Sequence, residues 1–323
     1  MAPAACKPYH EAMLSNFATA LELGDREAVR RAPKADLHIH GIGGGDRAFL
    51  RERTGVDITP LDRVLGSMAE MNAFADQQFS EVFAGAVGRA LAFEATFVQA
   101  RKDGVTRLEF GEDAWGITLH DGSAETLWRM LAAAHQAGAP KIEWIPQLGL
   151  SRHCGAQAID RWASPLLELG VFKTLDLSGD EFAQPIEVFA PIYRKAGAAG
   201  LRLKAHVGEW GTSDDVWRAV EVLELNEVQH GIAASGSPQV MRALANAGVR
   251  LNLCPTSNIK LGRVHRMSEH PIRVLFDAGV RVTVNTDDPL IFGCTLSGEF
   301  LALYEAGVMT ARELDFIRAT AFD

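Results

Sequence analysis

The sequence predicts an α/β fold, a (β/α)8 TIM barrel with an N-terminal helical extension and a helical insertion after the first strand. Its length of 323 residues suits such a barrel with insertions. Eight short β-rich runs alternate with segments of helical pattern, which is typical of βα units. No Pro/Ser-rich linker or low-complexity tract interrupts the alternation, so we expect a single domain over 1–323.

The elements follow in order along the chain. The N-terminal part, about 9–31, has a helical pattern. The eight β-rich runs cover 35–40, 105–111, 141–150, 171–179, 201–209, 227–232, 250–257 and 281–288. The segment 46–85 does not fit the alternation, and we expect it to be a helical insertion that lies at the barrel rim as a lid.

Three of the intervening helices have clear end signals. Ser123 precedes "AETLWRMLAAAHQAG", and Thr212 or Ser213 precedes a first turn that is rich in aspartate. The run "SPQVMRALANAG" has proline near its first helical position and glycine just past its end. An open doubly wound sheet is the alternative fold. It would carry G-x-G-x-x-G after the first strand, and "GIGGG" (41–45) lacks the third glycine.

Composition excludes several classes of function. The net charge is −9, from 41 acidic and 32 basic residues, and no Lys/Arg-rich run is present, so we expect no nucleic-acid partner and no membrane surface. No apolar stretch reaches the ~18 residues of a membrane span. The four cysteines are spread without a C-x-x-C pair, and "MAPAACKPYHEAML" has no signal-peptide pattern. We therefore expect a cytoplasmic protein, and nothing in the sequence indicates an oligomeric state.

Reactive side chains gather at the carboxyl ends of the expected strands, where barrel enzymes place their chemistry. Taken singly, each has an ordinary interpretation: a lone histidine is usually a surface or satisfied core residue, and an Asp-Asp pair is often a solvated turn or a helix cap. Their conjunction on four separate strands is harder to attribute to chance. The residues are His38, His40, His206, Glu209, His230, Asp287 and Asp288.

This set has the chemistry of a zinc site. His38 and His40 are two apart, so on a strand their imidazoles point to the same side. Three histidines and one aspartate are ligands that Zn²⁺ accepts while leaving room for a water molecule, whose pKa zinc lowers towards ~7. Glu209, three residues after His206, is then a candidate proton donor. His230 is a candidate base or orienting group, and Asp288 stays free for a substrate.

The remaining histidines and Cys254 are expected to have no catalytic role. Cys254 follows an apolar run and should pack as a small apolar side chain. The histidines fall in expected helices or loops; they are His10, His120, His135, His153, His265 and His270.

At these positions the sequence resembles the adenosine deaminase family of the amidohydrolase superfamily. The matching stretches span nearly the whole chain in family order. They are "PKADLHIH" (33–40), "LDLSGDE" (175–181), "KAHVGE" (204–209), "QHGI" (229–232), "CPTSN" (254–258) and "NTDDPLIF" (285–292).

The resemblance implies a zinc-dependent hydrolytic deaminase of a purine or purine-nucleoside-like substrate, with one Zn²⁺ per chain. It implies metal ligation by His38, His40, His206 and Asp287, and catalysis by Glu209, His230 and Asp287. Glu209 would protonate the ring nitrogen beside the attacked carbon, and His230 would orient and help deprotonate the attacking water. His40, Gly179 and Asp288 would contact the substrate. A two-metal site with a strand-four lysine is disfavoured, because Lys173 lies near the start of that strand.

The sequence departs from the family pattern in three places. Gly41-Ile42-Gly43 stands where adenosine deaminases carry an aspartate that holds the ribose 5′-hydroxyl, and where adenine-specific relatives carry glutamate. This predicts a modified or non-ribose far end of the substrate. "RLEFGEDAW" replaces the usual ending of strand two, so Glu112, Asp113 and Trp115 either line the entrance or form a surface loop. Relatives usually continue into a final helix, so we expect a short or truncated C-terminal part.

Two other functions stay open at this point. One is a related hydrolase that acts on another amino-heterocycle or cleaves a ring amide. Glu209 in "HVGE" argues for ring protonation and hence for deamination. The other is a noncatalytic metal-binding barrel, which the complete set of polar residues disfavours.

Overall fold

The computed structural model describes residues 15–323. The first six residues of the expected N-terminal helix (9–14), the segment examined for a signal peptide, Cys6 and His10 lie outside the described residues.

Eight parallel strands follow one another around the barrel in chain order, each hydrogen-bonded to the next. The ring nearly closes just past the ends of the first and last strands. There, Ile39 and Asp287 form a parallel bridge, with the His40 N–H donating to the Asp287 carbonyl at 3.0 Å. The predicted (β/α)8 barrel is confirmed. The strands are β1 (Lys34–Asp36), β2 (Val105–Asp113), β3 (Glu143–Ser151), β4 (Thr174–Ser178), β5 (Arg202–Val207), β6 (Glu227–His230), β7 (Arg250–Leu253) and β8 (Arg281–Val284).

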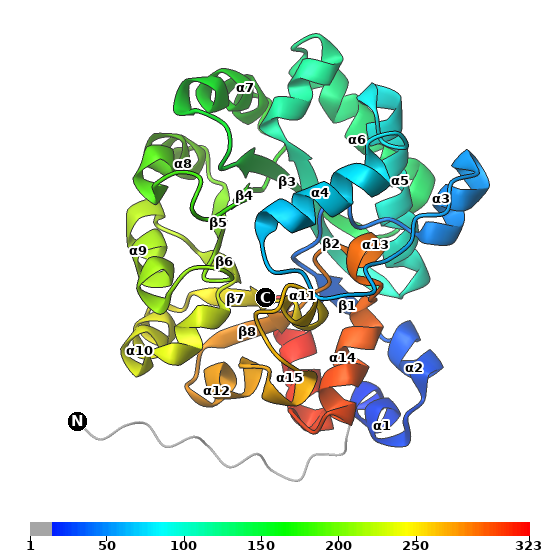
Figure 1. Ribbon diagram of the computed structural model, residues 1–323, viewed down its shortest axis with the longest axis vertical. Coiled ribbons are helices and arrows are strands. Elements are labelled where there is room, and N and C mark those ends of the chain that lie inside the picture. The colour runs from blue at the N-terminus through cyan, green and yellow to red at the C-terminus, as the bar shows by residue number, and fades with distance from the viewer. Residues whose placement is uncertain (1–14) are drawn as a thin grey trace.

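Helices surround the strands, as Figure 1 shows in a view that looks into the barrel. Their apolar faces bury residues such as Leu127, Val216 and Leu244 against the sheet. The α-helices between the strands are α5 (Gly85–Lys102), α6 (Ala124–Gly138), α7 (Ala156–Glu168), α8 (Ala190–Ala198), α9 (Ser213–Leu223), α10 (Pro238–Ala247), α11 (Pro255–Lys260) and α12 (Ile272–Asp277). Short 3-10 turns are η1 (Ala114–His120), η2 (Ile186–Phe189), η3 (Ile232–Gly236) and η4 (Met267–Glu269).

The N-terminal extension is two helices instead of one. α1 (Asn16–Leu23) ends at Gly24, whose φ of 64° is a left-handed conformation that stops the helix. α2 (Arg26–Arg31) then starts anew, because the Asp25 side chain accepts a hydrogen bond from the Ala28 N–H. The helical prediction therefore holds for the described part, with a break at 24–25.

The insertion after β1 contains α3 (Arg47–Thr54) and α4 (Met68–Phe79), joined by a segment without helix or strand. Figure 1 shows α4 in front of the barrel strands, and its residues Met68, Met71 and Phe79 line a cavity at the barrel mouth. Leu50, Met71 and Phe79 pack with residues of α13 (Pro289–Phe292) in a cluster separate from the main core. Apolar packing therefore fixes the insertion against the loop that follows β8.

The part of the chain after β8 is helical. Besides α13 it contains α14 (Leu296–Glu305) and α15 (Ala311–Thr320). α15 begins with a capping box, in which the Thr310 hydroxyl accepts from the Glu313 N–H and the Glu313 carboxylate accepts from the Thr310 N–H. The chain thus continues through three helices after β8.

No described helix combines the length and the apolar character that crossing a membrane would need. The cysteines at 154, 254 and 294 are free.

Candidate active site

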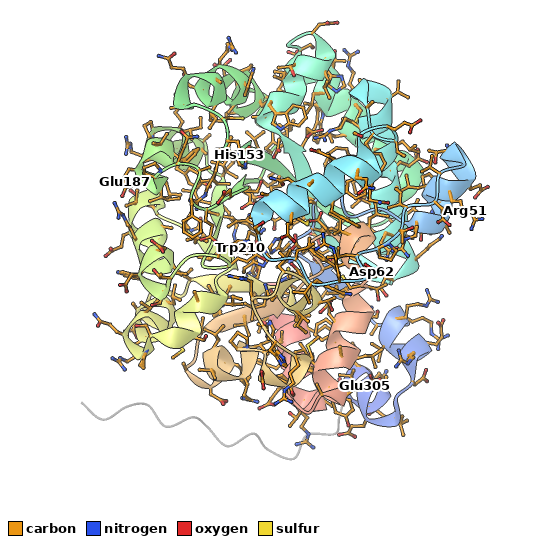
Figure 2. All side chains as sticks on the ribbon, in the orientation of Figure 1. Arg51, Asp62, His153, Glu187, Trp210 and Glu305 are labelled. Atoms are coloured by element: carbon orange, nitrogen blue, oxygen red, sulfur yellow. The ribbon has the colours of Figure 1, made fainter. Side chains whose placement is uncertain are left out.

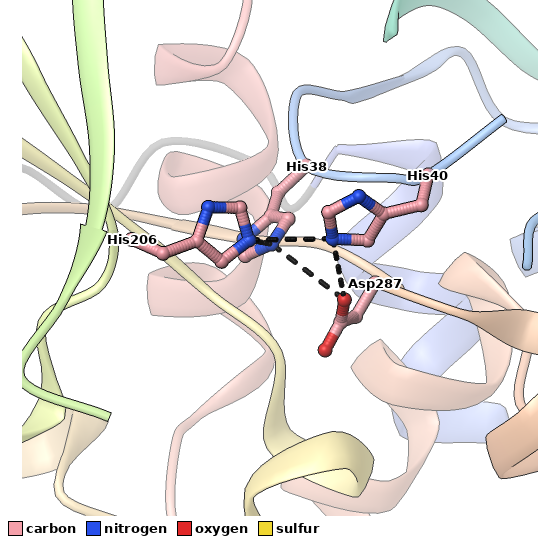
Figure 3. Close-up of side chains that lie close together, drawn as sticks. All are labelled: His38, His40, His206 and Asp287. Atoms are coloured by element: carbon pink, nitrogen blue, oxygen red, sulfur yellow. Dashed lines mark hydrogen bonds and ion pairs between the residues drawn. The ribbon is translucent and has the colours of Figure 1, made fainter. Parts of the chain in front are cut away.

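Four side chains converge at the carboxyl ends of β1, β5 and β8 (Figure 3). The Nε2 atoms of His38 and His206 are 3.0 Å apart, and Nε2 of His40 lies 3.3 Å from that of His206. Asp287 Oδ1 is 3.1 Å from His40 Nε2 and 3.7 Å from His38 Nε2. Donor atoms held ~2.0–2.1 Å from one tetrahedral zinc ion lie about 3.3 Å from each other, so this spacing fits such an ion.

The second nitrogen of two of these rings faces an acceptor. His38 Nδ1 lies 3.1 Å from the Asn252 carbonyl oxygen, and His206 Nδ1 lies 3.2 Å from Asp176 Oδ2. A proton on each Nδ1 satisfies these contacts and leaves a lone pair on each Nε2. Two lone pairs that face each other at 3.0 Å repel unless a cation lies between them. The donor set therefore fits a metal ion.

The backbone is strained where it presents two of the site residues. His230 and Asp287 have φ values of 60° and 65°, in the left-handed region that residues other than glycine rarely adopt. Asp287 is held there by hydrogen bonds to the segment after β1, including its N–H to the His38 carbonyl at 2.8 Å. The Ser257 hydroxyl donates to Asp287 Oδ2 at 2.6 Å. Burial opposes the charge of Asp287, but His40 and the other imidazoles outweigh it and lower its pKa.

Glu209 and His230 lie side by side next to these four residues. Glu209 Oε1 is 3.5 Å from His230 Nδ1, and both side chains are buried. Burial, together with the charges of Asp287 and Glu181, raises the pKa of Glu209 well above its usual value. The protonated form of Glu209 is therefore favoured more than that of an exposed glutamate. Burial likewise lowers the pKa of His230 to about 3, which keeps its ring neutral.

A hydrogen-bonded chain orients His230 from behind. Asn258 Nδ2 is 3.3 Å from His230 Nδ1, and Asn258 Oδ1 is 3.2 Å from Nε2 of the buried His270. The Ile272 N–H donates to His270 Nδ1 at 3.2 Å. His270 is thus a neutral ring that donates from Nε2, which fixes the direction of the Asn258 amide.

Asp288 and Gly179 face the same space from opposite sides of the barrel mouth. Burial and Asp287 raise the pKa of Asp288 to about 7, against the effect of His40. Gly43 passes so close that a Cβ there would overlap the Asp288 carboxylate, so only glycine fits. Gly179 has a φ of 96°, which also favours glycine.

One cavity of about 480 Å³ lies at the barrel mouth, and seven of these residues line it: His40, Gly179, His206, Glu209, His230, Asp287 and Asp288. Apolar residues of the cavity wall come from Ile42, the insertion and α5: Met68, Met71, Ala75, Phe79, Phe83 and Phe93. The insertion also contributes the polar Asn72, Asp76 and Ser80.

A charged group forms another part of the cavity wall. Arg89 makes a two-pronged ion pair with Glu112, in which Nε lies 2.8 Å from Oε2. Its guanidinium lies over the Trp115 ring, whose N–H donates to Asp113 Oδ2 at 3.0 Å. Glu112, Asp113 and Trp115 all line the cavity. Of the two interpretations of "RLEFGEDAW", the structure therefore supports the one in which these residues line the entrance.

Several residues around the site were not singled out in the sequence. Asp176 faces inward on β4, two residues before Ser178, but a single aspartate in "LDLSG" gives no sign of its contact with His206. Asn258 lies in a stretch that matches the family, without an assigned role. His153 was assigned to a loop, and it is exposed yet lines the cavity. Cys254 is buried as expected, and its Sγ lies 3.3 Å from His38 Nδ1.

Comparisons with known proteins agree with this geometry. The family model described as adenosine deaminase matches residues 116–322. The adenine deaminase of Acinetobacter baylyi is 30% identical over 93% of this chain and 94% of its own length. The crystal structure of an adenine deaminase from Arthrobacter aurescens superimposes with a TM-score of 0.78, at 23% identity over 90% of this chain and 92% of its own. An amidohydrolase from Burkholderia ambifaria, solved with bound zinc, has a TM-score of 0.69 at 18% identity over 97% of both chains.

Proposed function

The chain belongs to the adenosine deaminase family, and from this premise we propose that it is a zinc-dependent deaminase of a purine or purine-nucleoside-like substrate. Its relatives identify it as a hydrolase that acts on carbon–nitrogen bonds in cyclic amidines. The metal, the residue roles and the nature of the substrate are the parts that we propose. The observation that carries the proposal is the convergence of three imidazoles and a carboxylate beside the buried Glu209.

We assign the metal ligands as His38, His40, His206 and Asp287, for one zinc ion per chain. When bound, zinc would act as a Lewis acid and lower the pKa of a water molecule held beside it. The short Nε2–Nε2 distance between His38 and His206 supports the assignment, since it needs a cation to be stable.

The chain's own residues then move the protons. Glu209 donates a proton to the ring nitrogen beside the carbon that carries the amine, which makes that carbon easier to attack. His230, which Asn258 orients, positions the water whose oxygen adds to this carbon and helps Asp287 to deprotonate it. The amine takes up the proton removed from the water, the carbon–nitrogen bond breaks and ammonia leaves. In total, one water and one amine give one ring carbonyl and one ammonia.

The substrate ring would lie between Asp288 and Gly179. The Asp288 carboxyl, with its pKa near 7, can donate to or accept from a ring nitrogen, and the Gly179 N–H can donate to the edge of the ring. His40 lines the cavity beside Asp287, so it would contact the ring as well as the metal. The insertion 46–85 would act as a lid, because its side chains form part of the cavity wall.

The far end of the cavity indicates an uncharged substrate. Arg89 is already neutralised by Glu112, so it offers no free cation for a phosphate, while Asp113 adds a negative charge. Ile42 cannot hydrogen-bond a ribose hydroxyl, and burying that hydroxyl without a partner would cost a few kcal/mol. We therefore favour a free purine base, or a nucleoside with an apolar substituent, over a nucleotide.

An isotope experiment tests the proposed reaction. The zinc-loaded enzyme is incubated with adenine in H₂¹⁸O, and the product is analysed by mass spectrometry alongside an ammonia assay. One ¹⁸O in the new carbonyl for each ammonia released supports the hydrolytic deamination of adenine. The same result with an amino-heterocycle outside the purines, and none with purines, would overturn the assignment of the substrate.

A further inference from the structure

Glu181 makes an unusual set of contacts next to the proposed acid. It lies in the loop after β4, and its side chain is only 8% exposed. Its carboxylate accepts hydrogen bonds from three consecutive backbone N–H groups just past β5. They come from Gly208 at 2.8 Å to Oε2, and from Glu209 and Trp210 at 2.9 and 2.7 Å to Oε1. The buried carboxylate of Glu181 is thereby stabilised by N–H groups of the turn that carries Glu209.

This turn needs such support. Gly208 has a φ of 72°, and a Cβ there would lie 2.2 Å from the Val216 side chain, so only glycine fits. Three successive N–H groups that point the same way cannot bond within the turn, and buried N–H groups without partners cost free energy. Hydrogen bonds to an ionised carboxylate are about twice as strong as neutral ones. Glu181 is thus the group that holds this backbone conformation.

A second contact ties the two loops together. The buried Arg152 donates from Nη1 to the Glu181 carbonyl at 2.8 Å and from Nη2 to the His206 carbonyl at 2.9 Å. The loop that carries Glu181 is therefore fixed to the end of the strand that carries both His206 and the turn. Gly211 leaves room for the arrangement, since a Cβ at this position would lie 2.8 Å from Glu181 Oε2.

We propose that Glu181 is a positioning residue for the reaction: its carboxylate sets the turn 208–210 so that Glu209 points at the substrate ring. The proposal rests on the proposed function for the role of Glu209. It goes beyond that function in assigning a task to a carboxylate that touches neither the metal ligands nor the substrate. Glu181 then acts only through Glu209, and this dependence can be measured.

The test is a double-mutant cycle on the zinc-loaded enzyme, with the best purine substrate. We expect Glu181→Gln to lower kcat about 10- to 100-fold with little change in KM, because the side-chain amide opposes the three N–H donors. In the Glu209→Gln background the same change should lower kcat less than twofold, since no acid remains to be positioned. Equal loss factors in both backgrounds would overturn the proposal, as would loss of zinc from Glu181→Gln.

Two further variants separate positioning from stability. Gly211→Ala keeps the charge of Glu181 but displaces Glu181 Oε2. It should therefore lower kcat less than Glu181→Gln does, and this loss should also depend on Glu209. Glu187→Gln is the matched control, since Glu187 pairs with Arg218 on the outer face (Figure 2) and should leave kcat within twofold of the parent.

Hydrogen exchange of the peptide over 205–212 gives a readout that does not need activity. Glu181→Gln should speed this exchange and Glu187→Gln should not; unchanged exchange would overturn the proposal. If the parent released no ammonia from any purine, the proposed function would fail. If the parent were active and the two losses were independent, only the role of Glu181 would fail.

Discussion

Oδ2 of Asp176 lies 3.2 Å from Nδ1 of His206, on the side of the ring opposite the convergent Nε2 atoms. Both side chains are buried, and burial opposes the charge of Asp176, but His206 lowers the pKa of Asp176 below its usual value. The carboxylate therefore stays ionised and holds the imidazole with its Nε2 lone pair toward the other ligands. This contact joins β4 to the proposed metal site, although no residue of β4 itself is a proposed ligand.

Asp176→Asn should weaken metal binding without abolishing it. The amide no longer fixes the protonated Nδ1, and loss of such partners typically costs about 10- to 100-fold in metal affinity. Competition with a chromophoric chelator measures the zinc dissociation constant. Asp160→Asn, an exposed aspartate paired with Lys195, serves as the control. An unchanged zinc affinity in Asp176→Asn would contradict this role.

His38→Ala should lose zinc and activity together, because His38 is the most buried of the proposed ligands. Glu209→Gln should keep one zinc per chain and lose most of its turnover. Metal analysis by mass spectrometry, run beside an ammonia assay, separates the two outcomes. His265→Ala is the control, since His265 is exposed and its charged neighbour is Glu269, which is not a proposed ligand. Full activity of His38→Ala with stoichiometric zinc would show that the ligand assignment is wrong.

Adding a phosphate to the best substrate should lower kcat/KM. Asp113 and the neutralised Arg89 make the far end of the cavity unfavourable for an anion, and a repulsion of about 1.4 to 3 kcal/mol corresponds to a 10- to 100-fold loss. Steady-state kinetics with adenosine and adenosine 5′-monophosphate measure the ratio. Asp113→Asn should reduce the penalty. A monophosphate turned over as efficiently as the nucleoside would contradict the charge argument.

Stability should fall as the pH is lowered below about 6.5, in part because of His270. Burial lowers the pKa of His270 to about 3, whereas an unfolded histidine titrates near 6.5. Between these values the unfolded chain binds the extra proton, so the free energy of unfolding decreases with falling pH, by up to ~1.4 kcal/mol per pH unit for one proton. This share of stability is fully present above pH 6.5.

Urea unfolding at pH 7, 6 and 5 measures this dependence. His270→Gln cannot titrate at this position, so its stability should depend less steeply on pH than that of the parent. Parallel pH dependences of the two proteins would show that the pKa of His270 does not differ between the folded and unfolded states, which would contradict this account.

The barrel could be predicted because its signals are local. Each strand is a short β-rich run, and Ser123 and Thr212 cap helices where expected. Parallel strands bring their carboxyl ends to one side, so the sequence alone indicated which polar residues would meet. The predicted strand ends were less accurate. β1 was expected to extend to residue 40, but it ends at Asp36, before His38 and His40, because Ile39 pairs with Asp287 after β8.

The supporting contacts could not be predicted from the sequence. Asp176, Asn258 and Glu181 each act on a partner from another βα unit, and their own neighbours in sequence give no hint of it. The break at 24–25 was missed, although Gly24 and Asp25 are residues that commonly end and start helices. The Arg89–Glu112 pair joins a helix to a strand over 23 positions, and only the packed structure brings the two together.

The measurement that tests the account most directly is ammonia release by the enzyme loaded with one zinc per chain. The panel comprises adenine, adenosine, 5′-modified adenosines, guanine and aminopterins, with Glu209→Gln assayed in parallel. The account predicts ammonia from at least one purine, in a one-to-one ratio with the oxo product, and at least ~10²-fold less from Glu209→Gln. Zinc-loaded protein that releases no ammonia from any purine would contradict it.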